Sequence, residues 1–199
     1  DANCELLDMN PAGLAMIEAE NLKQLLGHSV LGLVDAKYQE PFLKLVADVF
    51  NGKAGTLEFE MTSLKGTNRW IDTHEVPLRN AAGKIVSALG VSRDITERKR
   101  IEQSLRIAEE RYRSIFENSL DGIYQTTRDG RFILANSAMA TIFGYDSPEE
   151  LVSSIMDVTS LYADPHDRTK LKNTLTKEEK AEGYEFRALR KNKEIIWVR

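Results

Sequence analysis

The spacing of apolar residues divides the first half of the chain into a helical part and a strand part. Residues 4–9 form a short apolar run that predicts a strand, and Asn10-Pro11 has the chemistry of a helix start. Residues 38–50 carry apolar side chains at helical spacing. The apolar period then changes to two, which predicts three strands: 56–64, 69–78 and 85–95. The short turns between them imply an antiparallel sheet.

A polar helix with a narrow apolar stripe is expected next. Neither Gly nor Pro interrupts residues 94–118, and the hydroxyl of Thr96 is expected to cap the helix start. The stripe consists of Ile101, Leu105, Ala108, Tyr112 and Ile115. It covers about two heptads, fewer than the three or four that define a coiled coil. The stripe is interpreted as a dimer seam, with a helix lying on a neighbouring domain as the alternative.

The pattern of the first half returns after this helix. Asn136 matches Asn10 at an offset of 126 residues (136 minus 10), and Trp197 matches Trp70 at 127 (197 minus 70). An offset held this closely over some sixty positions indicates an internal repeat. By this alignment the first copy lacks its first strand and the second copy lacks its last.

Composition narrows the classes of function. The chain has 199 residues and a net charge of −4, so it shows no basic footprint for nucleic acid. No apolar run approaches the roughly 18 residues of a membrane span, so no membrane contact is expected from it. The single cysteine, Cys4, cannot form an internal disulfide, which fits a reducing, cytoplasmic compartment. The parent protein itself could still be membrane-anchored.

The order of these motifs resembles the PAS family, over essentially the whole chain and as two tandem copies. The residues that carry the resemblance are Asp129 to Asn136, Ile142-Phe143-Gly144-Tyr145, Ser147 to Leu151, Asp164 to Arg168 and Gly90 to Lys99. The resemblance implies an α+β fold, in which each domain is a five-stranded antiparallel sheet with a helical face around a small pocket. The expected organisation is a PAS domain over 1–96, a helical linker over 97–114 and a second PAS domain over 115–199.

Two cofactor chemistries known in this family fit the sequence poorly. Covalent flavin attachment needs a cysteine on the helix that faces the flavin, whereas Cys4 lies at the expected start of a strand. Haem ligation needs a histidine inside the longer helix, whereas His166 stands just before it and His28 lies in a loop. No grouping of residues has metal-ligand spacing, and no nucleophile–base pair or carboxylate dyad emerges. The fragment is therefore expected to be non-catalytic and without a metal, and its cofactor stays unknown.

The strand around Trp70 supplies the weak pocket candidates. Alternation places Ile71, Thr73 and Glu75 on one face, and the resemblance implies that this face lines the pocket. The alternative for Glu75 is that its carboxylate reaches solvent near the strand end, and this reading is favoured because buried carboxylates are uncommon. Trp70 is expected on the outer face, where a linker helix or a dimer partner could cover it.

Two hypotheses of function remain. In the first, the chain senses a small ligand or partner, and Asp94, Ile95 and Thr96 transfer the signal through the helix to a bacterial histidine kinase or diguanylate cyclase outside these residues. In the second, the chain is a structural dimerisation spacer whose pockets are filled by its own side chains. Bound small-molecule density or a ligand-dependent melting shift would separate them.

Overall fold

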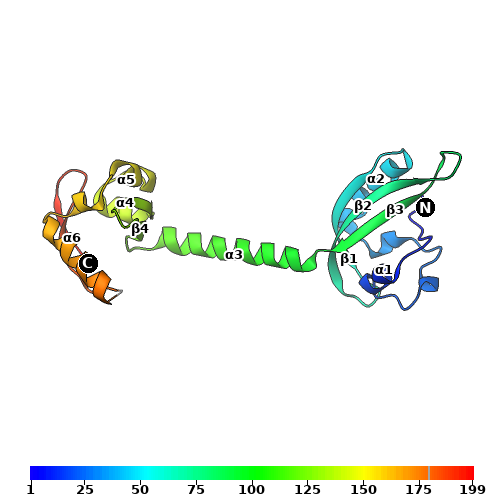
Figure 1. Ribbon diagram of the computed structural model, residues 1–199, viewed down its shortest axis with the longest axis horizontal. Coiled ribbons are helices and arrows are strands. Elements are labelled where there is room, and N and C mark those ends of the chain that lie inside the picture. Colours follow the sequence, from blue (N-terminus) through cyan, green and yellow to red (C-terminus); the bar gives the residue numbers. More distant parts are fainter. Residues whose placement is uncertain (179) are drawn as a thin grey trace. The chain divides into compact units, whose positions relative to one another are not determined.

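The computed structural model describes residues 1–178 and 180–199. The chain divides into two compact units, Asp1–Leu105 and Arg106–Arg199, which we call the first and second domains. Helix α3 (Thr96–Asn118) contains the division between them (Figure 1).

The first domain is an antiparallel sheet with helices on one face. Its helices are α1 (Pro11–Met16), the 3-10 turns η1 (Leu22–Gln24) and η2 (Val30–Leu33), and α2 (Ala36–Phe50). Its strands are β1 (Gly55–Thr62), β2 (Asn68–Arg79) and β3 (Ile85–Asp94), in the order β1-β2-β3. The three strands and α2 confirm the elements predicted from apolar spacing. Helix α2 packs against the sheet (Figure 1).

The core of the first domain lies between α2 and the inner face of the sheet. Helix α2 buries Phe42, Leu45, Val46 and Val49, a spacing that keeps all four on one side of a helix. They meet Phe59 and other alternate residues of the strands, because successive strand residues point to opposite faces. The amphipathic patterns thus define one contiguous core.

The strand expected over residues 4–9 is wrong. Only isolated bridges form there, between Glu5 and Ser29 and between Leu6 and Leu26. Cys4 has a φ of 61°, a left-handed conformation that a strand does not tolerate. The apolar run therefore contributes Cys4 to the core without forming a regular strand.

The second domain repeats the order of elements with two hairpins in place of one larger sheet. Its helices are α4 (Ser137–Phe143), α5 (Pro148–Ser154), the 3-10 turn η3 (Val158–Leu161) and α6 (Pro165–Glu178). Strands β4 (Tyr124–Thr126) and β5 (Phe132–Ala135) form one hairpin, and β6 (Phe186–Leu189) and β7 (Ile195–Val198) form the other. The five strands that the resemblance implies per domain are therefore represented by three strands and by two pairs.

The internal repeat is visible in strand register. Glu60 lies opposite Trp70 in the β1-β2 hairpin, and Arg187 lies opposite Trp197 in the β6-β7 hairpin. Both members of the second pair stand 127 residues after those of the first. The turns close alike, since Ser63 N donates to Thr67 O at 2.9 Å and Arg190 N donates to Glu194 O at 2.9 Å. The two hairpins are copies down to the residue.

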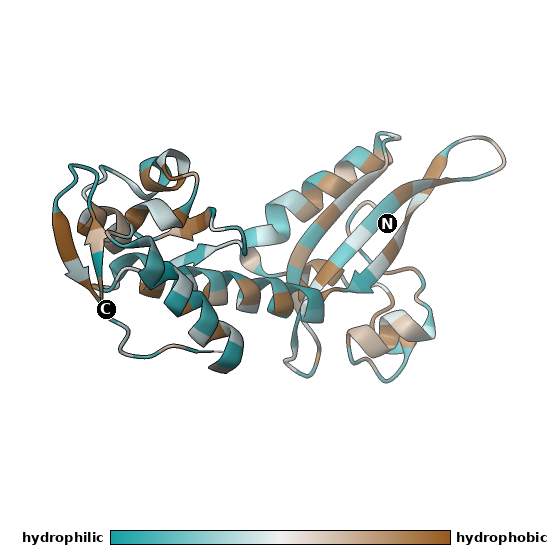
Figure 2. Ribbon diagram, turned by 60° about the vertical axis from the view of Figure 1, so that its left-hand side comes forward, coloured by the Kyte–Doolittle hydropathy of each residue, from teal (hydrophilic) through white to brown (hydrophobic). Residues whose placement is uncertain are grey.

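Helix α3 is polar on most of its surface. Figure 2 shows hydrophilic residues along it, interrupted by hydrophobic bands. The exposed fractions are 60% for Ile101, 59% for Leu105, 61% for Tyr112 and 71% for Ile115, so this stripe is uncovered within the chain. Among the described residues, none of the helices combines the length and the apolar character needed to cross a membrane.

Asn136 holds the second domain together at the start of α4. Its side chain is 0% exposed and accepts hydrogen bonds from the amides of Met139 and Ile123, both at 2.9 Å. Its amide group donates to the carbonyls of Phe116 and Asp121, both at 2.9 Å. One side chain therefore satisfies four backbone groups, where the counterpart Asn10 satisfies one, the amide of Gly13.

Replacing Asn136 by alanine is expected to lower the free energy of unfolding of the second domain by about 3 kcal/mol or more, because buried backbone groups lose their partners. The matched Asn10→Ala variant removes one exposed cap and should cost about 1 kcal/mol in the first domain. Denaturant unfolding followed by tryptophan fluorescence separates the domains, since Trp70 lies in one and Trp197 in the other. Equal losses from the two variants would contradict the proposed role of Asn136.

Candidate functional site: the strand–helix junction and the second-domain cavity

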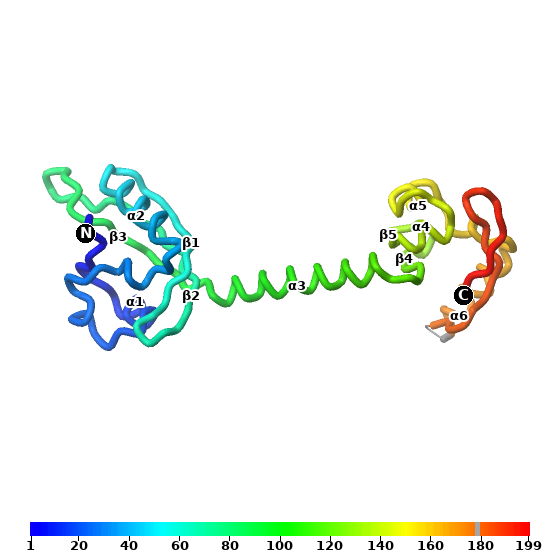
Figure 3. The backbone as a smooth tube through the Cα atoms, turned by 180° about the vertical axis from the view of Figure 1, so that it is seen from behind, coloured from blue at the N-terminus to red at the C-terminus, as the bar shows by residue number. Residues whose placement is uncertain are grey.

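The chain passes from β3 to α3 through one residue, Ile95, and side-chain hydrogen bonds fix this junction (Figure 3). We use the name junction for Asp94, Ile95 and Thr96. The Thr96 hydroxyl accepts a hydrogen bond from the backbone amide of Trp70 at 2.9 Å and donates to the Asp94 carboxylate at 2.5 Å. The Thr96 amide donates to the same carboxylate oxygen at 2.9 Å. The first residue of the helix is thus bound to strand β2.

The expected cap function of Thr96 is corrected by this geometry. The carbonyl of Ile95 accepts the first helical bond, from Lys99 N at 3.0 Å, so Ile95 occupies the N-cap position. The Asp94 carboxylate, rather than the Thr96 hydroxyl, satisfies a free amide of the first turn. The hydroxyl is used instead to join the helix to the sheet.

Arg69 of β2 completes the junction. Its Nη1 lies 2.8 Å from Asp94 Oδ2, and its Nη2 lies 3.5 Å from Glu18 Oε1. Partial burial acts to raise the pKa of Asp94, but the hydrogen bonds from Thr96 and Arg69 outweigh it and hold the pKa below its ordinary value. Asp94 therefore stays ionised near neutral pH and keeps all three donors.

A second group of contacts binds the first turn of α3 to the outer face of the sheet. Glu58 of β1 lies 2.6 Å from both Arg98 Nη2 and Lys99 Nζ, and these hydrogen bonds, that of Lys99 first, lower the pKa of Glu58. The Lys99 ammonium also lies 4.9 Å from the centre of the Trp70 ring, a cation–π contact. Tyr38 meets the same ring edge-on at 5.7 Å. The start of the linker helix thus partly covers Trp70.

The inner face of β2 carries the predicted pocket candidates, and all three are buried. The exposed fractions are 1% for Ile71, 2% for Thr73 and 9% for Glu75. The favoured reading that Glu75 reaches solvent is therefore wrong, because Gly90 lies opposite it and leaves room for the carboxylate on the inner face. Burial raises the pKa of Glu75.

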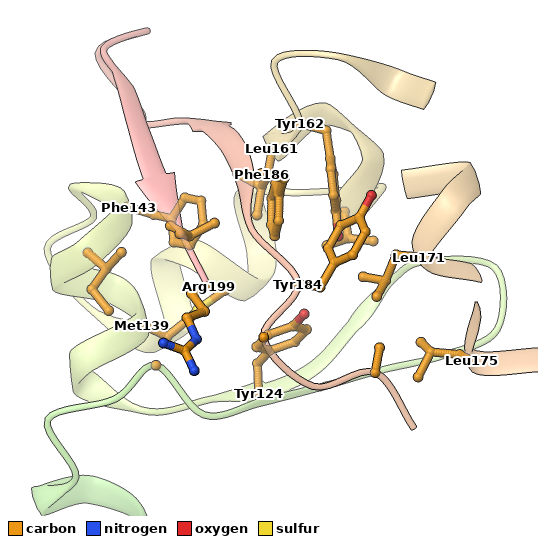
Figure 4. A pocket seen from close by; sticks show the side chains of 16 residues that line it. Tyr124, Met139, Phe143, Leu161, Tyr162, Leu171, Leu175, Tyr184, Phe186 and Arg199 are labelled. Carbon is orange, nitrogen blue, oxygen red and sulfur yellow. The ribbon is translucent and has the colours of Figure 1, made fainter. Parts of the chain in front are cut away.

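The second domain contains a cavity of about 340 Å³. Figure 4 shows aromatic and aliphatic side chains facing it from several elements. Its lining includes Tyr124, Met139, Phe143, Leu161, Tyr162, Leu171, Leu175, Tyr184, Phe186, Val198 and Arg199. This volume falls in the lower range of small-molecule sites, and the lining is mainly apolar, as in such sites.

Aromatic rings and an arginine give this cavity its chemical character. The rings of Tyr162 and Phe186 stack with centroids 4.2 Å apart, and the Tyr184 hydroxyl donates to Asp167 O at 2.8 Å. Arg168 is 9% exposed, lies over Tyr162 at 5.9 Å and leaves its Nε without a hydrogen-bond partner. The surroundings therefore suit a small planar or apolar molecule.

Sequence reasoning missed this cavity, although the repeat offers a signal for it. Adding the 127-residue offset to Ile71 gives Val198, which lines the cavity. The other two candidates, Thr73 and Glu75, have counterparts beyond Arg199. Applying the offset to the inner face would have pointed to the second domain.

The remaining chemistry-bearing residues are scattered. Cys4 is buried in the first core, and burial raises the pKa of its thiol. His166 is the second residue of α6, and its Nδ1 lies 3.0 Å from Asp164 Oδ1 at the surface. Within residues 1–178 and 180–199, no cluster of three or more His, Cys, Asp or Glu side chains could hold a metal ion.

Comparison with known proteins shows the family. Residues 1–100 match the family model described as PAS fold, and residues 110–179 match the one described as PAS domain. A PAS domain of a protein from Colwellia psychrerythraea is similar in structure, with 26% identity and a TM-score of 0.43, over 47% of this chain and 80% of that one.

Two curated relatives are bacterial kinases. Sporulation kinase E of Bacillus subtilis is 44% identical over 55 residues, which is 28% of this chain and 8% of the kinase. The sensor histidine kinase TmoS of Ectopseudomonas mendocina is 32% identical over 118 residues, which is 56% of this chain and 12% of that protein. The chain thus spans a small part of either relative. It belongs to the PAS family and consists of two PAS domains in tandem, related to the sensor regions of histidine kinases.

Proposed function

We propose that this chain is a sensory relay, in which a small ligand or partner changes a PAS domain and α3 carries the change toward an output domain. The observation that carries the proposal is the Thr96 hydroxyl, which contacts Asp94 of β3 and the backbone of Trp70 in β2 while belonging to the first turn of α3. A movement between these strands must therefore stretch or release a bond to the helix. Junctions of this kind are biased by small free-energy differences.

The cavity of the second domain supports the sensing part of the proposal. A volume of about 340 Å³ suits a small organic molecule, and aromatic side chains supply contact area at little entropic cost. The occupant we propose is a small, largely apolar molecule.

The output is proposed from the relatives alone. PAS domains are not themselves catalytic, and both curated relatives are kinases, so we infer that a histidine kinase, or else a cyclic-dinucleotide enzyme, receives the signal. A cytoplasmic location is part of this proposal, because the one cysteine, Cys4, is a buried free thiol that suits a reducing compartment.

A structural spacer is the second candidate function, and the first domain favours it. Its interior is filled by its own side chains, among them Phe42, Phe59 and Ile71. A spacer needs no ligand. Melting of the chain with the small-molecule fraction of a bacterial lysate separates the two: a shift confined to the second domain favours the relay, and no shift favours the spacer.

The junction should be marginal enough to switch. Thr96→Ala removes the bonds to Asp94 and Trp70, and losing helix-end bonds typically costs about 0.5–2 kcal/mol. Amides in the first two turns of α3 should therefore exchange with deuterium roughly 2- to 30-fold faster, while the rest of the first domain keeps its protection. In the chain joined to a histidine kinase core, the ligand response of autophosphorylation should be lost.

Thr62→Ala is the matched control for this prediction. Its hydroxyl donates to Asn68 Oδ1 at 2.9 Å in the same sheet and touches no residue of α3. Exchange in α3 and the kinase response should both survive. A normal response in Thr96→Ala would rule the junction out as the coupling point, and global unfolding of that variant would make the residue structural.

We also propose that the exposed stripe of α3 pairs with a second copy of the chain. Ile101, Leu105, Ala108, Tyr112 and Ile115 recur at steps of four, three, four and three, the spacing of a two-helix seam. Ala108 at the centre allows the helices to approach closely. Large apolar side chains exposed by about 60% or more along one helix face are a contact surface rather than a normal exterior.

Leu105→Asp is expected to weaken this dimer at least tenfold, because a carboxylate would be buried without a partner. Ser104→Asp introduces the same charge one residue off the stripe and should leave the dissociation constant unchanged. Sedimentation equilibrium measures both. A chain that is monomeric before substitution, or equally dimeric after Leu105→Asp, would show that the stripe is not the interface.

A further inference from the structure

The outer face of the β6-β7 hairpin repeats the helix-contacting residues of the first domain. Glu185 and Trp197 stand 127 residues after Glu58 and Trp70, and the register of the two hairpins is the same. In the first domain this glutamate and this tryptophan hold the first turn of α3, through Arg98 and Lys99.

In the second domain the same pair is uncovered. Trp197 is 71% exposed, whereas its counterpart Trp70 is half-buried. Glu185 is exposed, and among the described residues it makes no ion pair or hydrogen bond. Both groups that bind a helix start in one copy therefore lack an occupant in the other.

The positions around this pair are not repeated. Glu60, which pairs with Lys37 rather than with α3, is replaced by Arg187. Thr62 and Asn68, which bond to each other, are replaced by Leu189 and Ile195. Between the two hairpins, then, the outer-face positions that touch the helix keep their side chains, while these three positions that do not touch it have changed. A general structural role of this face would not produce that selection.

We propose that the outer face of β6-β7 is a docking site for the first turn of a helix that presents two adjacent basic side chains. Glu185 binds them as Glu58 binds Arg98 and Lys99, and Trp197 receives one of them over its ring. Leu189 and Ile195, which is 54% exposed, add apolar surface that the first domain lacks at this place. The helix therefore also carries an apolar residue beside its basic pair.

A second copy of the same face is a poorer occupant. Three apolar side chains supply far less than the roughly 800 Å² per partner of a stable interface. A helix turn needs only a small area and uses the acidic group that an isologous contact would leave next to its own copy. The inference extends the proposed relay to a second helix, and its test needs no ligand, so its failure would leave the relay itself untouched.

The test attaches the proposed occupant to the full chain. A flexible Gly-Ser linker after Arg199 carries a second copy of Thr96–Glu110, which raises its local concentration to the millimolar range. The matched control carries the same segment with Arg98→Glu and Lys99→Glu. The chain has two tryptophans, so two indole N–H signals appear in the nitrogen-15 NMR spectrum, assigned by Trp70→Phe and Trp197→Phe.

The basic segment should shift the Trp197 signal and leave the Trp70 signal in place, and the charge-reversed segment should do neither. Glu185→Lys should abolish the shift with the basic segment and produce one with the reversed segment. Equal shifts with both segments, no shift at Trp197, or a Trp197 shift that follows protein concentration without any attached segment would each overturn the proposal. An unchanged Trp70 signal verifies that the first domain is folded in every variant.

Discussion

A helix that begins one residue after a strand must satisfy its free amides within a few ångströms of the sheet, and this constraint shapes the first domain. Asp94 meets it by accepting the Thr96 amide and the Thr96 hydroxyl, and the hydroxyl in turn accepts the Trp70 amide. Arg69 neutralises the carboxylate from the neighbouring strand. Without this set of bonds the end of β3, the edge of β2 and the start of α3 would be independent of one another.

The sequence predicted the strands and helices well, because apolar periodicity reports which face of an element is buried. It located the junction as well, since Asp94 and Thr96 have side chains suited to a helix start. It misassigned their roles, because the partner of the Thr96 hydroxyl is a backbone amide 26 residues earlier, and no local pattern encodes a contact of that kind. Residues 4–9 failed for a related reason: their apolar pattern is compatible with a strand, and only the left-handed conformation of Cys4 excludes it.

The site was harder to predict than the fold. Glu75 was expected in solvent on the general rarity of buried carboxylates, and the deciding factor is the glycine that faces it across the strands, Gly90. The cavity of the second domain depends on the spacing between two separate hairpins and α6, which a residue pattern does not measure. The two domains share a backbone plan yet differ inside: one interior is filled and carries a polar group, and the other is hollow and aromatic.

The two carboxylates of β2 and β3 give the first domain opposite responses to acidity. Asp94 has a lowered pKa in the folded state, so the stability it contributes is complete above about pH 4 and is lost as the pH falls through its folded-state value. Glu75 has a raised pKa, so it costs nothing below about pH 4 and destabilises the fold increasingly as the pH rises toward its own folded-state value. Taken together, these two groups favour the folded first domain most in mildly acidic solution. Because both lie in strands that end at the junction, the room that Gly90 leaves for one buried side chain ties the proton concentration of the medium to the firmness with which the helix is held.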